Sequence, residues 1–434
     1  MNCWRAAKSV PICAGSIAEV RCRVCGEDGV LPFLDLGTHP LSDALLKPEQ
    51  LASPEPRFGL QVAFCPACKI VHILEDVAQE LLFPPDYPYF SSFSDQLLEH
   101  SRRHALERIS ADGLSENSLV VELASNDGYL LQTFVELGIP VLGIDPAPNQ
   151  VQVANERGIR SICEFFGLDL AQRLVAGDYP GFGPSRADVI IANNVCAHVP
   201  DLNGFVAGMA EMLRPGGRIT IENPYVRDLI DHCEFDTIYH EHLYYHSCTG
   251  WDGLAQRHGL HLNHVEYFPE LHGGTLRWHL SHAPGRSAAL ETFLADEDRI
   301  GLNDFGYYEG FAERVEDLRS DLLALISSIR AEGKTVAAYG AAAKGSTLLN
   351  YVGLGTELVD FVVDRNVHKH GLLMPGTHQQ IRPVEALLTE QPDFALILAW
   401  NFKDEIMKQQ AAYQVAGGRW IVPVPTPLIE SAEV

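Results

Sequence analysis

Two stretches of this chain alternate short apolar strands with amphipathic helices, and this alternation restricts the fold more than any other feature. In the first stretch, strand patterns at 118–123 and 141–145 flank a helical pattern at 129–137. A strand, a helix and a second strand in this order form a βαβ unit with parallel strands. Further strand patterns at 187–194 and 218–224 extend the unit. The sequence therefore predicts an α/β domain with a doubly wound sheet.

A second alternating stretch follows a long helical pattern. Apolar residues recur at helical spacing between about 307 and 331, which predicts one amphipathic helix that bridges two domains. Strand patterns at 335–340, 358–364 and 393–400 come next, with a helical pattern after the first of them. The order of elements matches the first stretch, although the two sequences do not repeat each other. We therefore expect a second, C-terminal α/β domain.

Two Cys-x-x-Cys pairs precede both stretches. Cys22 and Cys25 form one pair, Cys65 and Cys68 form the other, and the segment around them is rich in turn residues. Two such knuckles can supply four thiolates in tetrahedral order, the arrangement that Zn²⁺ prefers in structural sites. A small loop-rich module also needs such a cross-link, since it has little core of its own. Bound iron and ordinary free cysteines stay open as alternatives, because the gap between the pairs is longer than usual.

The charge balance disfavours several classes of function. The 434 residues include 32 Lys and Arg against 57 Asp and Glu, a formal net charge of −25. Such a chain repels phosphate backbones and anionic lipids, so we expect neither nucleic-acid nor membrane binding. No apolar run approaches the roughly 20 residues that span a bilayer. We expect a folded, cytoplasmic protein of about two to four domains, whose oligomeric state the sequence does not give.

The first βα turn has features of a nucleoside-cofactor site. The strand ends near Glu122, the turn that follows carries Asn126 and Gly128, and Asp145 ends the next strand. A carboxylate at that place can accept hydrogen bonds from both hydroxyls of a ribose. Only one glycine stands where a dinucleotide fingerprint has three, which favours S-adenosylmethionine over NAD. A plain scaffold turn is the alternative.

The segment 232–246, HCEFDTIYHEHLYYH, is dense in His, Tyr and acidic residues. It resembles H-E-x-x-H only superficially, because His240, Glu241 and His242 lack the i, i+4 histidine pair of the zinc proteases. It can supply a histidine base, a carboxylate that orients this base, and a tyrosine that donates to a developing oxyanion. A surface cluster of polar aromatic residues is the alternative.

Two further patterns can hold an anionic ligand. The segment LHGGTLR at 271–277 has glycines that admit a close backbone approach, and Arg277 is suited to a phosphate oxygen. In the C-terminal stretch, GAAAKGST at 340–347 opens a helix after a strand, where an anion can bind. Lys344 precedes the second glycine of this segment, so it is not a Walker A loop. An ordinary β-turn and an ordinary helix start are the alternatives.

These features occur in one order: the four-cysteine module, a Glu-x-x-x-Asn-Asp-Gly turn, Tyr-His-Glu-His, His-Gly-Gly-x-x-Arg and the C-terminal α/β domain. In this order, from residue 21 to about 425, the chain resembles the zinc-containing, S-adenosylmethionine-dependent C-methyltransferases of nucleotide-linked 4-keto-deoxysugars. The resemblance implies a lead-in at 1–20, a zinc-bound module at 21–90, and a cofactor-binding methyltransferase domain with a Rossmann-like sheet at 91–285. Residues 286–434 would form the linking helix and a Rossmann-like domain that helps to hold the sugar nucleotide.

The resemblance also implies roles for single residues. Structural zinc would be held by Cys22, Cys25, Cys65 and Cys68. The cofactor would lie among Glu122, Asn126, Gly128, Asp145, Asn193 and Asn194, with Tyr87 or Tyr89 closing over it. His242 would be the base, with Tyr239 and Glu241 beside it. The nucleotide diphosphate would be contacted by His272, Arg277 and Lys344.

The implied reaction follows from the small-molecule substrate. A ketone at C4 acidifies the adjacent C–H bonds, so His242 would remove a proton, and the enolate would take the methyl group at C3 or, alternatively, at C5. Tyr239 would stabilise the oxyanion. An NAD-dependent nucleotide-sugar oxidoreductase and a non-catalytic sugar-nucleotide-binding protein are the alternatives. An RNA methyltransferase with a zinc ribbon is disfavoured by the net charge.

Overall fold

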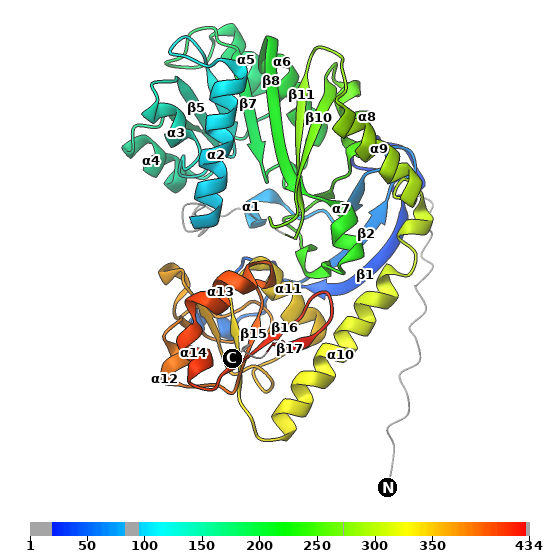
Figure 1. The fold of residues 1–434 in the computed structure, drawn as a ribbon, viewed down its shortest axis with the longest axis vertical. Coiled ribbons are helices and arrows are strands. Elements are labelled where there is room, and N and C mark those ends of the chain that lie inside the picture. Colours follow the sequence, from blue (N-terminus) through cyan, green and yellow to red (C-terminus); the bar gives the residue numbers. More distant parts are fainter. Residues whose placement is uncertain (1–19, 83–94, 272, 431–434) are drawn as a thin grey trace.

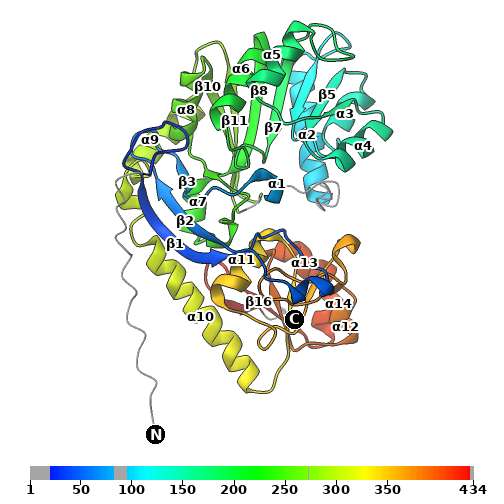
Figure 2. The same cartoon turned by 180° about the vertical axis from the view of Figure 1, so that it is seen from behind.

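The computed structural model describes residues 20–82, 95–271 and 273–430, and Figure 1 and Figure 2 show it from two opposite sides. It contains a four-stranded sheet, a seven-stranded sheet and a six-stranded sheet. Helix α10 (Phe311–Ala331) runs along the molecule from the central part to the C-terminal part. The prediction of an α/β chain with two Rossmann-like sheets and a small N-terminal module is confirmed.

The N-terminal sheet has the order β1-β2-β3-β9, and its neighbours are antiparallel. Three strands come from the N-terminal module: β1 (Leu31–His39), β2 (Phe58–Phe64) and β3 (Val71–Ile73). The fourth strand, β9 (Tyr244–Tyr245), lies far along the chain, in the segment 232–246 that we call the histidine-rich segment. The module also contains η2 (Pro48–Ala52) and α1 (Gln79–Leu82). One sheet thus joins the N-terminal module to the central domain.

The central sheet has the order β10-β11-β8-β7-β4-β5-β6. All neighbours from β8 to β6 are parallel, whereas β11 is antiparallel to both β8 and β10. Its strands are β4 (Val120–Leu123), β5 (Val141–Asp145), β6 (Ser161–Cys163), β7 (Ala187–Asn193), β8 (Leu213–Pro224), β10 (His261–Phe268) and β11 (Thr275–Ser281). The helices of this region are α2 (Asp95–Asp112), α3 (Leu131–Glu136), α4 (Pro148–Glu156), α5 (Leu168–Ala176), α6 (Leu202–Met212), α7 (Val226–Asp231), η4 (Phe235–Thr237), α8 (Cys248–Arg257), α9 (Ala288–Ile300) and η5 (Phe305–Tyr307).

Two inner strands of the central sheet lie entirely in the core. Every residue of β4 and β5 is buried. Helices cover both faces of such a sheet, which is why these strands are continuous apolar runs rather than alternating patterns. Pro215, Gly216 and Gly217 lie inside β8, where the register against β7 shifts between Ala187↔Leu213 and Val189↔Arg218. Gly216 takes a positive φ of 79° at this irregularity.

The C-terminal sheet has the order β14-β13-β12-β15-β16-β17, parallel except for β17. Its strands are β12 (Val336–Tyr339), β13 (Val362–Asp364), β14 (Ile381–Pro383), β15 (Phe394–Ile397), β16 (Arg419–Val422) and β17 (Leu428–Glu430). The helices are α11 (Ala343–Val352), η6 (Val367–Lys369), α12 (Ala386–Thr389), η7 (Trp400–Phe402), α13 (Lys403–Gln409) and α14 (Ala411–Val415). The strand order reverses between β12 and β15, and between β4 and β7 in the central sheet. Such switch points create a crevice at the carboxyl ends of the strands.

One apolar core runs through all three parts of the chain. The long helix contributes the residues that its helical pattern predicted: Phe311, Val315, Leu318, Leu322, Ile326 and Ile329 are all buried. At the start of this helix, the ring of Tyr308 stacks on Phe64 of β2 with centroids 4.8 Å apart. The linking region therefore packs on the N-terminal module as well as joining the two α/β domains.

A buried carboxylate fixes the N-terminus of α8. Glu297 of α9 is fully buried and accepts from the amides of Cys248 and Thr249, at 2.7 and 2.8 Å, and from the hydroxyl of Tyr225 at 2.9 Å. The two amides are among the first of α8, which have no partner inside the helix. Glu297 thus joins two helices and the end of the central sheet.

We expect Glu297→Gln to lower the free energy of unfolding by roughly 1–3 kcal/mol, because one buried amide would then face an NH₂ group instead of an oxygen. Glu291→Gln on the exposed first turn of the same helix is the matched control and should change stability by less than about 0.5 kcal/mol. Urea unfolding followed by fluorescence measures both. Equal stability of the two variants would show that this cap does not stabilise the fold.

Candidate active site and metal centre

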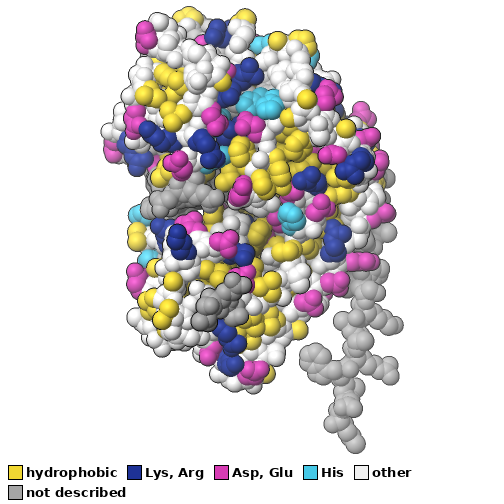
Figure 3. Space-filling model, viewed as in Figure 1, with side chains coloured by type: hydrophobic (Ala, Val, Ile, Leu, Met, Phe, Trp, Pro, Cys, Tyr) yellow, Lys and Arg dark blue, Asp and Glu magenta, His cyan; other side chains and the backbone are white. Residues whose placement is uncertain are grey.

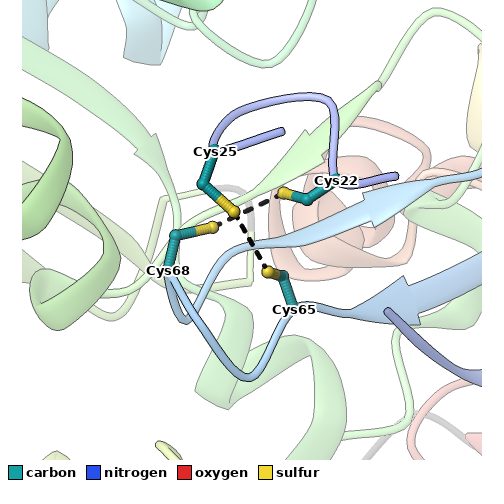
Figure 4. Close-up of side chains that lie close together, drawn as sticks. All are labelled: Cys22, Cys25, Cys65 and Cys68. Carbon is teal, nitrogen blue, oxygen red and sulfur yellow. Dashed lines mark hydrogen bonds between the residues drawn. The ribbon is translucent and has the colours of Figure 1, made fainter. Parts of the chain in front are cut away.

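The four cysteines of the N-terminal module converge on one point. Their sulfur atoms all lie within 4.8 Å of one another. The two closest contacts, drawn in Figure 4, join Cys22 to Cys68 and Cys25 to Cys65 at 3.5 Å each. A tetrahedral zinc ion with bonds of about 2.3 Å needs sulfurs roughly 3.8 Å apart. The sulfur positions therefore fit a structural zinc ion, as predicted.

Both knuckles have the same backbone form. The amide of Gly26 donates to the carbonyl of Cys22 at 2.9 Å, and the amide of Lys69 donates to that of Cys65 at 2.8 Å. Gly26 and Lys69 both have positive φ, at 73° and 62°. Each knuckle thus closes four residues after its first cysteine and turns its two thiolates to one side.

The predicted cofactor residues gather at the carboxyl end of the central sheet. Asp145 ends β5, and its carboxylate accepts from the amides of Asn126 and Ala147 at 2.9 Å each, which ties it to the turn after β4. Gly128 in that turn has a φ of 79°, and a Cβ there would lie 2.5 Å from the Cδ1 of Ile159. The turn therefore needs glycine at this position, and the carboxylate is held at the place where a ribose would bind.

Two side chains at the same edge have buried atoms without a partner among the described residues. Glu122 is 1% exposed, and its Oε2 atom makes no hydrogen bond among the described residues. Burial raises the pKa of Glu122 well above its ordinary value, and the charges of Asp145 and Asp127 add to this. The Oδ1 atom of Asn193, at the end of β7, is also buried and unpartnered. Neighbouring Asn194 has a positive φ of 53° and donates its amide to Glu222. Unsatisfied polar atoms of this kind fit an edge that a polar cofactor completes.

Tyr239 and His242 form a hydrogen-bonded pair on the histidine-rich segment. The Tyr239 hydroxyl lies 2.8 Å from His242 Nε2, and His242 Nδ1 lies 2.9 Å from the carbonyl of Thr237. A carbonyl can only accept, so Nδ1 carries the proton, and in the neutral imidazole the Nε2 lone pair accepts from the tyrosine. The His198 ring lies 4.8 Å from that of His242.

These two side chains are also the accessible ones. Between Cys233 and Cys248, every residue is buried except Tyr239 and His242, which are partly exposed. The segment is thus core except for a phenol and an imidazole that a substrate can reach. In a surface cluster, most residues of the segment would be exposed. The burial of all but Tyr239 and His242 therefore favours the alternative prediction, in which His242 is a base and Tyr239 an oxyanion donor.

Glu241 points to a different neighbour from the one expected. The sequence suggested a carboxylate beside the base, but the carbonyl of Thr237 orients His242 instead. Glu241 is buried, its Oε2 atom is unpartnered, and the closest charge is that of Asp43 in the N-terminal module. Burial first, and the Asp43 charge second, raise the pKa of Glu241 to about 8. Glu241 is therefore mainly protonated near neutral pH and faces the N-terminal module.

Lys344 lies at the contact between the C-terminal domain and the histidine-rich segment. Its ammonium donates to Asn401 at 2.7 Å and lies 4.3 Å from the centre of the Trp400 ring. Burial lowers the pKa of Lys344, and the nearby carboxyls of Asp236 and Glu234 oppose this shift. The Trp400 indole in turn donates to Asp236 at 2.7 Å. The lysine is thus held at a domain interface next to the candidate site.

Arg277 has partners other than the predicted phosphate. It lies on β11 with its side chain 2% exposed, and it donates to Glu222 at 2.5 Å. Glu107 and Glu266 lie 3.4 and 3.5 Å away. This guanidinium neutralises the buried carboxylate of Glu222 on β8. His272, Tyr87 and Tyr89 lie outside the described residues.

Three contacts of the site could not be found from the sequence. The Thr237 carbonyl that orients His242 belongs to the backbone, which carries no residue-specific pattern. Asp43 lies outside every motif of the sequence, and Asp236 lies in the 232–246 segment without any sign of its partner; only the fold brings them to Glu241 and Lys344.

Three family models match the chain. Residues 22–83 match a zinc binding domain, residues 96–265 a methyltransferase domain, and residues 270–425 a C-methyltransferase C-terminal domain. The chain is 34% identical over 416 residues to C-methyltransferase NovU from Streptomyces niveus. This match covers 95% of this chain and 97% of that protein. The chain belongs to the C-methyltransferase family.

Other comparisons cover smaller shares of the chain. A demethylmenaquinone methyltransferase from Tropheryma whipplei is 30% identical over 122 residues, 28% of this chain and 47% of that protein. The solved structure of magnesium protoporphyrin IX methyltransferase from Synechocystis with bound SAM superposes with a TM-score of 0.33 and 15% identity, over 44% of this chain and 82% of that one. The family match identifies this C-methyltransferase as an enzyme that uses S-adenosylmethionine and carries a structural zinc site. The oxidoreductase and binding-protein alternatives are thereby set aside.

Across the parts of the chain that the structure describes, no helix is both long and apolar enough to cross a membrane. On the face shown in Figure 3, Lys and Arg side chains are scattered among Asp and Glu rather than gathered into a patch. This agrees with the net charge of −25 and with a small-molecule substrate.

The raised pKa of Glu241 predicts a pH dependence of stability. The folded state holds this proton more tightly than the unfolded state, whose pKa is near 4.5. The resulting stabilisation is complete below that value and is lost as the pH rises through about 8, at up to roughly 1.4 kcal/mol per pH unit. Glu241→Gln stays neutral, so its unfolding free energy should fall less steeply than that of the wild type between about pH 5 and pH 9.

Glu291→Gln is again the control, because that carboxylate is exposed, and it should keep the wild-type slope. Urea titrations at a series of pH values give the slopes. If Glu241→Gln and the wild type lost stability in parallel, Glu241 would not be protonated in the folded protein.

Proposed function

We propose that this C-methyltransferase transfers a methyl group from S-adenosylmethionine to a carbon next to the ketone of a nucleotide-linked 4-keto-deoxysugar, at C3. The observation that carries this proposal is the Tyr239–His242 pair, which alone stays accessible in a buried segment. Methylation of an oxygen or nitrogen removes no proton from a carbon. Methylation of the carbon beside a ketone does, and this step needs a positioned base. The pair supplies that base and a hydrogen-bond donor together.

The proposed first step is proton transfer to His242. Its Nδ1–H is held by the Thr237 carbonyl, so the Nε2 lone pair accepts the proton from the sugar carbon. The C–H electrons become the C=C bond of an enolate, and the negative charge moves to the former ketone oxygen. In the substrate-free arrangement the Tyr239 hydroxyl occupies Nε2. On binding, it turns from the imidazole to this oxygen and stabilises its charge.

The second step forms the new carbon–carbon bond. Bound S-adenosylmethionine supplies an electrophilic methyl group on a sulfonium. The enolate carbon bonds to this methyl group while the sulfur takes back the bonding electrons and becomes a neutral thioether. The residues of the protein keep the enolate in line with the cofactor edge formed by Glu122, Asp145 and Asn193, and this orientation is their main contribution.

The sugar nucleotide is proposed to bind between the central and C-terminal domains. Lys344 brings a partly buried cation to this interface, near Glu234 and Asp236. A Cβ at Gly273 would collide with the Glu234 carboxylate, so glycine at this position lets the backbone approach this carboxyl group. Carboxyl groups accept from sugar hydroxyls, and the lysine can neutralise a phosphate. Arg277 is left out of this site because of its buried carboxylate partners.

The direct test is incubation of the purified protein with S-adenosylmethionine and a panel of nucleotide-linked 4-keto-6-deoxysugars, with products analysed by mass spectrometry and NMR. The proposal predicts one added methyl group on C3. Methylation on oxygen, or on C5, would correct the assignment. No product from any sugar would indicate another ketone substrate.

His242→Ala should lower kcat by roughly 10²–10⁴-fold and leave the affinity for S-adenosylmethionine unchanged, because the variant loses only the base. Tyr239→Phe should lower kcat by about 10²–10³-fold through loss of oxyanion stabilisation. Single-turnover kinetics and calorimetric titration of the cofactor separate the two effects. His282→Ala, at an exposed histidine after β11, serves as a control with wild-type turnover. Wild-type kcat in His242→Ala would disprove the base assignment.

A further inference from the structure

The N-terminal module contacts the chain directly after the proposed base. Strand β9 starts at Tyr244, and its two residues pair with Val71 and His72 of β3. The amide of Ile73 donates to the carbonyl of Leu243 at 3.0 Å. The three residues that follow His242 are therefore bonded to the sheet of the N-terminal module.

A second contact lies between Tyr239 and His242. His240 is fully buried, and its Nε2 lies 2.8 Å from the carbonyl of Gly59 on β2, to which it donates. Its ring also packs edge-on against Phe58, with centroids 5.8 Å apart. We call Thr237–His242 the catalytic segment. It is bonded to β2 through His240 and to β3 through the residues that follow it.

The thiolate site controls the register of these same two strands. Cys65 comes directly after the last residue of β2, and the turn through Cys68 leads into β3. The amide of Cys65 donates to the carbonyl of Ile70 at 3.0 Å, which closes this turn. A metal ion at Cys65 and Cys68 therefore fixes the β2–β3 hairpin from its end.

The first knuckle attaches the same site to the central domain. Asn203 of α6 donates to the carbonyl of Val24, between Cys22 and Cys25, at 2.8 Å. A Cβ at Gly250 of α8 would lie 3.0 Å from Ile70, so α8 packs directly on the second knuckle. Both knuckles are thus held against helices of the methyltransferase domain.

We propose that the N-terminal module is a positioning element of the methyl-transfer site. Zinc at the four cysteines fixes β2 and β3, and these strands hold Tyr239 and His242 in place through His240 and β9. His240 is a positioning residue rather than a catalytic one, because its side chain bonds to a backbone carbonyl away from the accessible pair. The claim about turnover depends on the proposed function, whereas the claim about geometry does not.

Hydrogen–deuterium exchange tests the geometry without any substrate. The full-length protein is compared with zinc bound and after chelation, with residues 237–246 as the reporter and β5 (Val141–Asp145) as the reference. Loss of zinc should speed exchange in 237–246 by roughly tenfold or more and leave β5 unchanged, because only the local contacts are lost. Unchanged exchange in 237–246, or an equal increase in β5, would overturn the proposal.

A matched pair of variants tests the effect on turnover with zinc in place. His240→Phe keeps a ring but loses the bond to Gly59, whereas His282→Phe loses a bond to a carbonyl, that of Gly259 at 3.4 Å, outside the N-terminal module. We expect His240→Phe to keep its zinc and its KM for S-adenosylmethionine, while kcat falls about 10–100-fold through misplacement of the base. His282→Phe should keep wild-type kcat.

Equal kcat values in the two variants would contradict the positioning role. If the wild type methylates none of the 4-keto sugars, the proposed function fails, and hydrogen–deuterium exchange of 237–246 in the two variants decides this inference by itself. Faster exchange in His240→Phe alone supports it, and equal exchange overturns it.

Discussion

The pairing of β9 with β3 is the contact on which the geometry of the site depends. Two residues of strand pairing are marginal by themselves. Here the pair is supported by burial of both tyrosines and by a hydrogen bond of 2.9 Å from the Tyr244 hydroxyl to the carbonyl of Pro200. Three segments that are distant in sequence meet at this strand: the second cysteine knuckle, the loop after β7 and the histidine-rich segment. The site therefore exists only when the N-terminal module and the central domain are both folded.

Buried carboxyl groups are the second constraint on this enzyme. The chain carries a net charge of −25, yet several acids lie inside it close to the site. Burial raises the pKa of Asp236 to about 7 and that of Glu241 to about 8. Raised pKa values keep such groups neutral for part of the physiological range, which reduces the cost of burying them. A cationic sulfonium is compatible with these surroundings, whereas a diphosphate needs the local positive charge of Lys344.

The sequence predicted the architecture well because the strongest patterns were local. The βαβ periodicity, the apolar face of α10 and the paired cysteines each follow from the spacing of residues in one stretch. The acid at the end of β5 and the glycine of the turn after β4 were found for the same reason.

The roles of Glu241 and Arg277 were harder to predict, because a motif gives residue type but not direction. Glu241 and His242 are adjacent in sequence, but their side chains point in different directions. That of Glu241 faces Asp43 of the N-terminal module, whereas that of His242 bonds to the carbonyl of Thr237. Arg277 has the residue type that a phosphate needs, but its place on β11 puts it beside Glu222. Such partners come from strand register, which one sequence does not reveal.

The central claim is that the imidazole of His242 removes a proton from the carbon beside a ketone. Deuterium uptake tests it most directly: a nucleotide-linked 4-keto-deoxysugar is incubated in D₂O with the enzyme and S-adenosylhomocysteine, so that no methyl group is transferred. We expect the wild-type protein to introduce deuterium at C3 and His242→Ala to do so no faster than buffer alone. Equal deuterium uptake by the wild type and His242→Ala would contradict it.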